Sequence, residues 1–482
     1  MSVTTQVDLL QNRRTKIIAT IGPASDSGEM LEALVLAGVN VFRLNMSHGD
    51  HAGHRQVFDR VQKVSEKLHL PVGILADLCG PKIRTGRFEG DAMNLVEGET
   101  VTVSTSAELG GNGLIVSQYK ALPDDVTPGD CILLADGLFE LRVDAVTGSD
   151  VTCTVIHGGK LGNNKGINLP GVNVSAPSLT SKDVEDARFA IDLGVDYIAL
   201  SFVRTATDVH DLRRLIDATG ASPRIIAKIE KPEALEHAEE ILEATDAIMI
   251  ARGDLGVELP PEQVPTAQSQ LISMALDTGT PVIVATQMLE SMISNSRPTR
   301  AEVTDVSHAV ASMADAVMLS AETAVGEFAV DAVRMMDRIA RQTESELWRR
   351  GEYGLTRRNL EPPIPLWTAI ASTTAHMSRD LMARAVMVVT RSGKSADIVS
   401  TSRPASPIVA ITHDPAVYRK LCIRWGVVPI LDSEVGSTNP NDLARRLSMD
   451  LGLAVPGQYV LLVCGFHGEQ DKNLPSVTVI EV

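Results

Sequence analysis

Residues 15–45 read TKIIATIGPASDSGEMLEALVLAGVNVFRLN. Two short runs in this stretch, Lys16–Ile21 and Val39–Leu44, are rich in β-branched apolar side chains and end in polar residues, which is typical of buried parallel strands. Between them, Ser27–Ala37 has apolar residues at helical spacing. The stretch therefore predicts a strand, a helix and a second strand, the unit from which parallel α/β folds are built.

The same alternation continues along the chain and is interrupted once. A third strand-like run, Val72–Ala76, follows a helical pattern at Ala52–Leu68. After the interruption, helical patterns such as Ser181–Leu193 and Glu262–Asp277 separate further runs. These later runs are Tyr197–Phe202, Ile225–Ile229, Ala247–Ala251, Val282–Ala285 and Ala316–Leu319. Eight strand–helix units in about 250 residues predict a closed (β/α)₈ barrel, and an open doubly wound sheet is the alternative.

The interruption, residues 86–176, has a different composition from the segments around it. It is rich in Gly, Val and Thr and contains alternating stretches at Thr100–Ser104, Glu140–Val146 and Val151–Ile156. We therefore expect an inserted all-β domain. Because it leaves directly after the third strand, at the face where barrel enzymes carry their sites, we expect it to act as a lid that excludes water.

A linker and a further domain follow the predicted barrel. Residues 349–365 contain two glycines and three prolines, and the region after them alternates strand-like runs with helical patterns. Those runs are Val386–Thr390, Ile408–Thr412, Val427–Leu431, Tyr459–Cys464 and Val477–Ile480. The predicted domains are an N-terminal segment (1–14), a catalytic barrel (15–85 and 177–348), the lid (86–176), a linker (349–365) and an open α/β domain (366–482).

Composition restricts the class of partner. The chain has 482 residues and a net charge of −17, which repels nucleic-acid backbones and anionic membranes. Aromatic residues make up only 3%, too few for the base-stacking surfaces of single-strand binders. The five cysteines form no CxxC pair, and we find no signal peptide or apolar run of about 18 residues. We expect a cytoplasmic protein that acts on small molecules.

Polar residues follow the predicted barrel strands and should converge on one face, because active sites of such barrels lie at the carboxyl ends of the strands. They are Arg43, Asn45 and Ser47; Asp77; Ser201; Lys228 and Glu230; Arg252 and Asp254; Thr286; and Ser320 and Glu322.

Two carboxylates in this set are suited to a metal ion. Lys228 and Glu230 alternate on an extended segment, so both side chains point to one side. Asp254 ends the neighbouring unit, and two carboxylates suffice for one Mg²⁺ that keeps waters and substrate oxygens. A structural salt bridge is the alternative interpretation. Arg43 and Lys228 favour an anionic substrate, and Lys228 could stabilise an enolate beside the metal.

Eight segments together resemble the pyruvate kinase family. They are TKIIATIGPAS (15–25), VNVFRLNMSHG (39–49), GPKIRTG (80–86), NKGINLPG (164–171), AKIEKPE (227–233), ARGDLGVELP (251–260), ATQMLESM (285–292) and MLSAETA (318–324). The resemblance implies transfer of a phosphoryl group from phosphoenolpyruvate to ADP, the last step of glycolysis, and protonation of the enolate to pyruvate. It also implies a homotetramer.

The resemblance implies a role for each matched residue. Glu230 and Asp254 would bind the Mg²⁺, for which Mn²⁺ is the alternative, and Gly253 and Thr286 would bind the substrate carboxylate. Arg43 would contact the transferred phosphoryl group, and Lys228 would stabilise the enolate. Ser320 and Thr286 would help to relay the proton. The nucleotide contacts would be Asn45, Ser47, His48, Arg84 and Lys165.

The GPKIRTG segment departs from many members of the family. Those members place K⁺ among residues matching Asn45, Ser47 and Asp77 and have Glu where this chain has Lys82. An ammonium about 4 Å from a competing cation costs on the order of 4 kcal/mol at an effective dielectric constant near 20. We therefore expect Lys82 to replace K⁺, and Leu78 resembles the same potassium-independent branch.

A loop in the C-terminal domain is suited to a phosphate. Thr390-Arg391-Ser392-Gly393-Lys394-Ser395 follows a strand-like run and precedes a helical pattern, so its hydroxyl and N–H groups can bind a phosphate at a helix N-terminus. It is not a Walker A loop, because Val388 stands where that motif needs glycine. By resemblance, we expect a sugar-phosphate effector at Thr390, Ser392, Gly393, Lys394 and Ser395.

Two other functions remain open from sequence. A catalytically silent metabolite sensor would keep the barrel, although the intact Lys228, Glu230, Asp254 and Thr286 argue against it. A mutase or aldolase could use a metal enolate, but the lid with Arg84 and Lys165 favours a nucleotide acceptor. The sequence does not determine the effector, the nucleotide base or the preference between Mg²⁺ and Mn²⁺.

Overall fold

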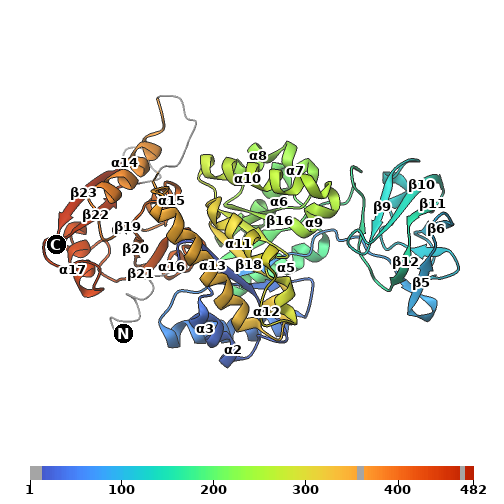
Figure 1. Ribbon diagram of the computed structural model, residues 1–482, viewed down its shortest axis with the longest axis horizontal. Coiled ribbons are helices and arrows are strands. Elements are labelled where there is room, and N and C mark those ends of the chain that lie inside the picture. The colour runs from blue at the N-terminus through green and yellow to red at the C-terminus, as the bar shows by residue number, and fades with distance from the viewer. Residues whose placement is uncertain (1–12, 355–362, 467–472) are drawn as a thin grey trace.

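The computed structural model describes residues 13–354, 363–466 and 473–482. Figure 1 shows three bodies in a row, with the barrel between the inserted β-domain at one end and the C-terminal domain at the other. Parts of the predicted N-terminal segment and linker lie outside the described residues.

The central body is a closed barrel of eight parallel strands, as the sequence predicts. In barrel order the strands are β1 (Lys16–Thr20), β18 (Ala316–Leu319), β17 (Val282–Ala285), β16 (Ala247–Ala251), β15 (Arg224–Ile229), β14 (Tyr197–Leu200), β3 (Gly73–Asp77) and β2 (Val41–Asn45). Closure rests on β1, which pairs with β2 on one side and with β18 on the other. The open doubly wound sheet is therefore excluded.

Helices surround the barrel and bury the outer faces of its strands (Figure 1). They are α2 (Gly28–Ala37), α3 (His51–Leu68), α5 (Ser181–Leu193), α6 (Ala206–Asp217), α7 (Pro232–Glu236), α8 (Ala238–Ala244), α9 (Arg252–Glu258), α10 (Val264–Thr278), α11 (Arg300–Ala311), α12 (Ala321–Ala324) and α13 (Ala329–Arg349). Local sequence explains several starts. Thr180 and Asp183, for example, form a capping box at α5.

The inserted body is built from short strands around a core of its own. A six-stranded sheet has the order β13 (Ile167–Asn168), β9 (Cys131–Leu134), β10 (Phe139–Thr147), β11 (Asp150–His157), β6 (Thr100–Ser104) and β8 (Leu114–Val116). Two pairs complete it, β12 (Gly159–Gly162) with β5 (Ala92–Leu95) and β4 (Arg87–Phe88) with β7 (Leu109–Gly110), and α4 spans Leu122–Asp125. We call this body the lid.

The C-terminal body is an open five-stranded sheet between helices. Its order is β21 (Val427–Leu431), β20 (Ile408–Thr412), β19 (Val386–Val389), β22 (Tyr459–Cys464) and β23 (Ser476–Glu481), and only β23 runs antiparallel to its neighbour. Its helices are α14 (Leu366–Asp380), α15 (Lys394–Thr401), α16 (Pro415–Lys420) and α17 (Pro440–Asp450).

Candidate active site

The carboxyl end of β15 carries a buried lysine among three polar partners. Lys228 Nζ lies 2.8 Å from Glu230 Oε1 and 3.3 Å from Asp77 Oδ1, and it donates a hydrogen bond of 2.7 Å to Ser201 Oγ. Burial alone would lower the pKa of Lys228, but Asp77 and Glu230 more than offset it and the pKa is raised. The lysine therefore stays a cation throughout the neutral pH range.

Arg43 joins this group from β2. Its Nε lies 2.6 Å from Asp77 Oδ2, and its Nη1 donates to Thr20 Oγ1 at 3.1 Å. Burial would raise the pKa of Asp77, yet Lys228 and Arg43 hold it below its usual range. Two cations thus share one fully buried carboxylate, and their N–H groups are the donors that the barrel mouth offers to an anionic substrate.

Glu230 and Asp254 are the predicted metal ligands. Glu230 Oε1 meets Lys228, and its Oε2 accepts the Phe202 amide at 2.8 Å, so the carboxylate is fixed in place. Burial raises the pKa of Glu230 against the opposing effect of Lys228, and the charge of Asp254 raises it further. Two carboxylates that repel each other gain from a cation between them.

The donor set fits Mg²⁺. No group of three or more His, Cys, Asp or Glu side chains among the described residues forms a metal cage. Mg²⁺ is commonly held by one or two carboxylates and completes its shell with water and substrate oxygens. Glu230 and Asp254 with an anionic substrate meet that requirement.

Thr286 and Gly253 lie together on the adjoining units. The Gly253 amide donates to Thr286 Oγ1 at 2.7 Å, and Thr286 has a positive φ of 69°. Arg252 holds this turn, because its Nη2 donates to the Thr286 carbonyl at 2.8 Å while Nη1 pairs with Asp305 at 2.5 Å. Asp305 was not predicted, because nothing in its own segment marks it.

Ser320 directly follows the last barrel strand, and its amide donates to Glu322 Oε2 at 2.7 Å. Glu322 Oε1 accepts the Leu289 amide at 3.0 Å. Burial raises the pKa of Glu322. Glu322 therefore ties the end of β18 to the loop after β17, where Thr286 lies.

The predicted nucleotide residues come from two places. Asn45 ends β2, and Ser47 and His48 follow it; Asn45 Oδ1 accepts the Ser47 amide at 3.2 Å. Arg84 and Lys165 lie on the two neighbouring segments by which the chain enters the lid and returns from it, which we call the outgoing and returning connectors. Arg84 Nη1 donates to the Asn164 carbonyl at 3.2 Å, and the Thr85 amide donates to the Lys165 carbonyl at 2.8 Å.

Lys82 lies at the same mouth but has a different partner from the one expected. Its Nζ is 3.7 Å from Asp254 Oδ1, whereas the ion pairs of Asp77 are with Arg43 and Lys228. Among the described residues, no hydrogen bond or ion pair joins Lys82 to Asn45, Ser47 or Asp77. Sequence spacing could not show this, because Lys82 and Asp254 are far apart in the chain.

An open cavity of about 570 Å³ marks where lid and barrel face each other. Lys82, Arg252, Gly253 and Asp254 line it from the barrel side, and Asp136 lines it from the lid. Ala135 and Asp136 both have positive φ, 53° and 58°, in the loop after β9. Asp136 was not predicted, because no motif in its segment distinguishes it from other loop carboxylates.

The predicted effector loop lies in the C-terminal body, apart from this mouth. Thr390 Oγ1 accepts the Gly393 amide at 2.9 Å, and Gly393, with a φ of 87°, precedes α15. Thr390 and Ser395 are buried, while Ser392 and Lys394 are exposed. The loop therefore presents a hydroxyl, an ammonium and, at Arg391, a guanidinium to solvent at the start of a helix.

These features define an enzyme class. A closed barrel that carries cations, paired carboxylates and an inserted domain at its carboxyl-end face is typical of enzymes that act on small molecules. Family profiles match residues 12–333 as "Pyruvate kinase, barrel domain" and residues 368–479 as "Pyruvate kinase, alpha/beta domain". The chain belongs to the pyruvate kinase family and is a phosphotransferase of glycolysis.

Individual relatives agree with this assignment. A pyruvate kinase of Mycobacterium intracellulare is 44% identical over 94% of this chain and 95% of its own length. A pyruvate kinase of Geobacillus stearothermophilus is 44% identical over 97% of this chain and 80% of its own length. The crystal structure of a pyruvate kinase from Cryptosporidium parvum superimposes with a TM-score of 0.90 at 37% identity, covering 98% of this chain and 97% of that one. No helix in the described part of the chain is long and apolar enough to cross a membrane.

Proposed function

We propose that this chain transfers the phosphoryl group of phosphoenolpyruvate to ADP and protonates the resulting enolate to pyruvate. The observation that carries the proposal is the buried Lys228 ammonium, which lies between Asp77 and Glu230 beside Arg43. Arg43 binds the phosphoryl group, and Lys228 faces the oxygen that becomes an enolate. A fixed cation at that point stabilises charge that develops in the transition state.

Glu230 and Asp254 would hold Mg²⁺, with Mn²⁺ as the alternative. When bound, the metal neutralises the charge of the substrate oxygens. The protein's own contribution is orientation: the Phe202 amide and Lys228 fix Glu230, and Gly253 with Thr286 receives the substrate carboxylate beside Asp254.

Nucleotide binding and proton transfer complete the scheme. Asn45, Ser47 and His48 from the barrel and Arg84 and Lys165 from the lid connectors contact ADP. Ser320 and Thr286 relay a proton to the enolate, and Glu322, bonded to the Ser320 amide, keeps that strand end in place.

The test is pyruvate formation from phosphoenolpyruvate, ADP and Mg²⁺, with ADP omitted as the control. Pyruvate formed in proportion to ADP supports the kinase. Conversion of phosphoenolpyruvate that does not require ADP would indicate another metal-enolate reaction and would overturn the proposal.

We also infer that K⁺ is not required, because Lys82 brings its own positive charge to the mouth. Two cations already share Asp77, which leaves little carboxylate charge for a further ion. The measurement is the rate in buffer free of K⁺ and Na⁺, with and without KCl. Activation by KCl of many-fold would reject this inference.

We infer in addition a sugar-phosphate activator at Thr390, Ser392, Gly393, Lys394 and Ser395, a homotetrameric assembly and a cytoplasmic location. The exposed Lys394 and Ser392 at the start of α15 support the activator site. The absence of disulfides among the described cysteines suits a reducing compartment such as the cytoplasm. Hexose and pentose phosphates that leave the KM for phosphoenolpyruvate unchanged would reject the activator, and sedimentation would test the assembly.

A further inference from the structure

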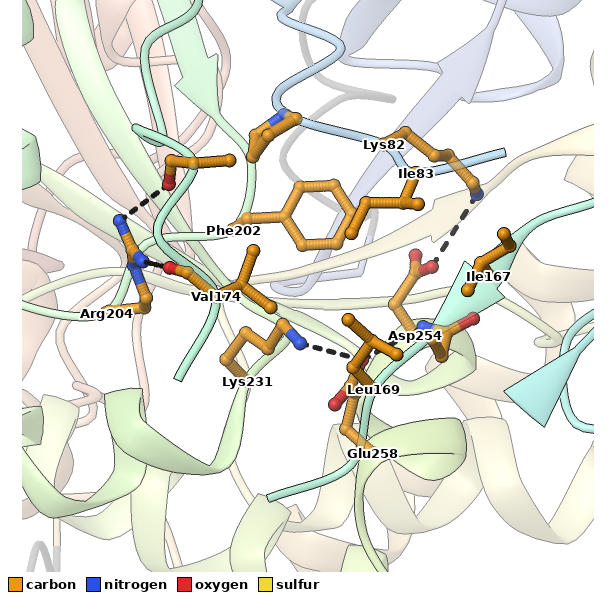
Figure 2. A pocket seen from close by; sticks show the side chains of 13 residues that line it. Lys82, Ile83, Ile167, Leu169, Val174, Phe202, Arg204, Lys231, Asp254 and Glu258 are labelled. Carbon is orange, nitrogen blue, oxygen red and sulfur yellow. Dashed lines mark hydrogen bonds and ion pairs between the residues drawn. The ribbon is translucent and has the colours of Figure 1, made fainter. Parts of the chain in front are cut away.

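A largely buried cluster outside the reaction scheme joins lid and barrel. Lys231 Nζ lies 2.9 Å from Glu258 Oε1, and Asn168 Nδ2 donates to the same oxygen at 3.0 Å. The side chains of Lys231 and Glu258 are only 9% and 1% exposed. Figure 2 shows Lys231 and Glu258 pointing toward each other, and both line a small cavity of about 30 Å³. We call Asn168, Lys231 and Glu258 the hinge cluster.

Both connectors between barrel and lid contact the short helix α9. The outgoing connector does so through Lys82 and Asp254, whose side chains are 32% and 26% exposed and 3.7 Å apart. The returning connector does so where it forms β13, through Asn168 and the buried Glu258. Solvent can replace the first contact at little cost, whereas loss of the second removes a hydrogen bond from a buried charge.

Glu258 depends on this contact more than a surface carboxylate would. Its Oε2 is buried and has no hydrogen-bond partner among the described residues, so Lys231 and Asn168 provide all its recorded polar contacts through Oε1. Because a buried charge that loses a hydrogen-bond partner is costly, each of these two contacts contributes strongly to the position of Glu258. Of the two contacts with α9, the Asn168–Glu258 contact is therefore the firmly held one, and the Lys82–Asp254 contact is the exchangeable one.

One residue proposed to contact the nucleotide and one that lines the mouth are linked directly to the Asn168–Glu258 contact. Lys165 precedes β13 by two positions, and β13 pairs with β9 through Ile167 and Leu134. The Ala135 amide donates to the Gly166 carbonyl at 2.9 Å, directly before Asp136 in the mouth. A shift of Asn168 would displace Lys165 and Asp136 together.

We propose that the hinge cluster is the pivot of the lid and that its three members are positioning residues for the nucleotide. Glu258 shares α9 with Asp254, and Lys231 follows Glu230 directly, so the cluster ties the lid to the two carboxylates proposed to hold the metal. The inference rests on the proposed function, because it assigns the lid to the ADP half of the reaction.

The test compares Asn168→Ala with Asn163→Ala. Asn163 is the matched control, because it also hydrogen-bonds on the lid but only to lid partners, Phe88 at 2.7 Å and Asp91 at 3.0 Å. We expect Asn168→Ala to raise the KM for ADP about tenfold and to leave the KM for phosphoenolpyruvate within about twofold. Asn163→Ala should change neither. Equal rises in both KM values, or an unchanged KM for ADP, would overturn the proposal.

Two further measurements separate positioning from general damage. Asn168→Asp is nearly isosteric but sets a carboxylate against Glu258, so it should raise the KM for ADP more than Asn168→Ala does. An Asn168→Asp enzyme that behaves as wild type would contradict the assignment of the pivot. Amide hydrogen exchange in residues 166–176 should be faster in Asn168→Ala and unchanged in Asn163→Ala. This readout needs no turnover, so it tests the pivot even if the proposed reaction is wrong.

Discussion

Lys228 Nζ lies 2.8 Å from Glu230 Oε1, so the cation proposed to stabilise the enolate and a carboxylate proposed to bind the metal are already in contact. Ile229 separates them, and the extended backbone turns both side chains to one side. Asp77 lies on the other side of the ammonium, so the two carboxylates together hold the Lys228 side chain in place. The site is organised before substrate arrives, which is what electrostatic catalysis requires.

The first prediction concerns this lysine. Lys228→Met should lower kcat by at least about a hundredfold, because it removes the fixed cation at the developing enolate. The KM for phosphoenolpyruvate should change far less, because Arg43 still binds the phosphoryl group. Steady-state kinetics of pyruvate formation measures both. Lys182→Met is the control, since Lys182 is 58% exposed on α5, and a Lys228→Met enzyme within tenfold of it would contradict the assigned role.

The second prediction concerns the metal. Glu230→Gln keeps the shape of the side chain and removes its charge, so the free Mg²⁺ concentration for half-maximal rate should rise about tenfold or more. Rate measured against free Mg²⁺ gives this value. Glu322→Gln is the matched control, because Glu322 is also a buried carboxylate at the mouth but its recorded hydrogen bonds are with backbone amides. Equal shifts in both variants would remove Glu230 from the metal site.

Patterns within short segments predicted most of the fold. The helix Ser181–Leu193 and the strands Ile408–Thr412, Val427–Leu431 and Tyr459–Cys464 are observed with the predicted limits. The limits of these elements follow from local periodicity and, for the helix, from the cap at Thr180, so they can be predicted without knowledge of distant contacts. The helix α9 was not predicted, because Gly253 and Gly256 lower the helix propensity of its segment.

Contacts between distant segments could not be predicted in the same way. We could predict that Lys228, Glu230 and Asp77 lie near one another, because they follow parallel strands whose carboxyl ends share one face of the barrel. Pairing of Lys82 with Asp254, and of Asn168 with Glu258, depends on how the lid connectors cross the barrel mouth. No spacing in the sequence encodes that crossing.

The third prediction tests the junction of barrel and C-terminal domain. Arg403 Nη2 lies 2.8 Å from Asp315 Oδ2, and the two side chains are 4% and 3% exposed. Asp315→Ala would leave the guanidinium buried without its carboxylate, which should lower the free energy of unfolding by about 3–5 kcal/mol. Urea unfolding measures the change. Asp331→Ala, which breaks an exposed pair with Arg334, should cost less than about 1 kcal/mol. Similar losses in the two variants would contradict the argument.

The last prediction is a pH dependence at the same junction. Lys16 Nζ donates to the Val427 carbonyl at 2.6 Å, and burial lowers the pKa of Lys16 to about 8. The unfolded chain should titrate this lysine near 10.4. Between pH 8 and about 10.4 the unfolded state binds one more proton at this lysine than the folded state does. The free energy of unfolding therefore rises with pH through this range, and Lys16 destabilises the folded state most below pH 8.

The measurement is the difference in the free energy of unfolding between wild type and Lys16→Met as pH is raised. From pH 7 to 10, wild type should gain about 2–3 kcal/mol relative to the variant, because a methionine side chain cannot titrate and all other groups are shared. Lys67→Met provides the control, since Lys67 is 66% exposed and its pair with Glu32 lies at the surface. A wild-type curve that stays parallel to that of Lys16→Met would mean that the buried lysine keeps its proton throughout the range.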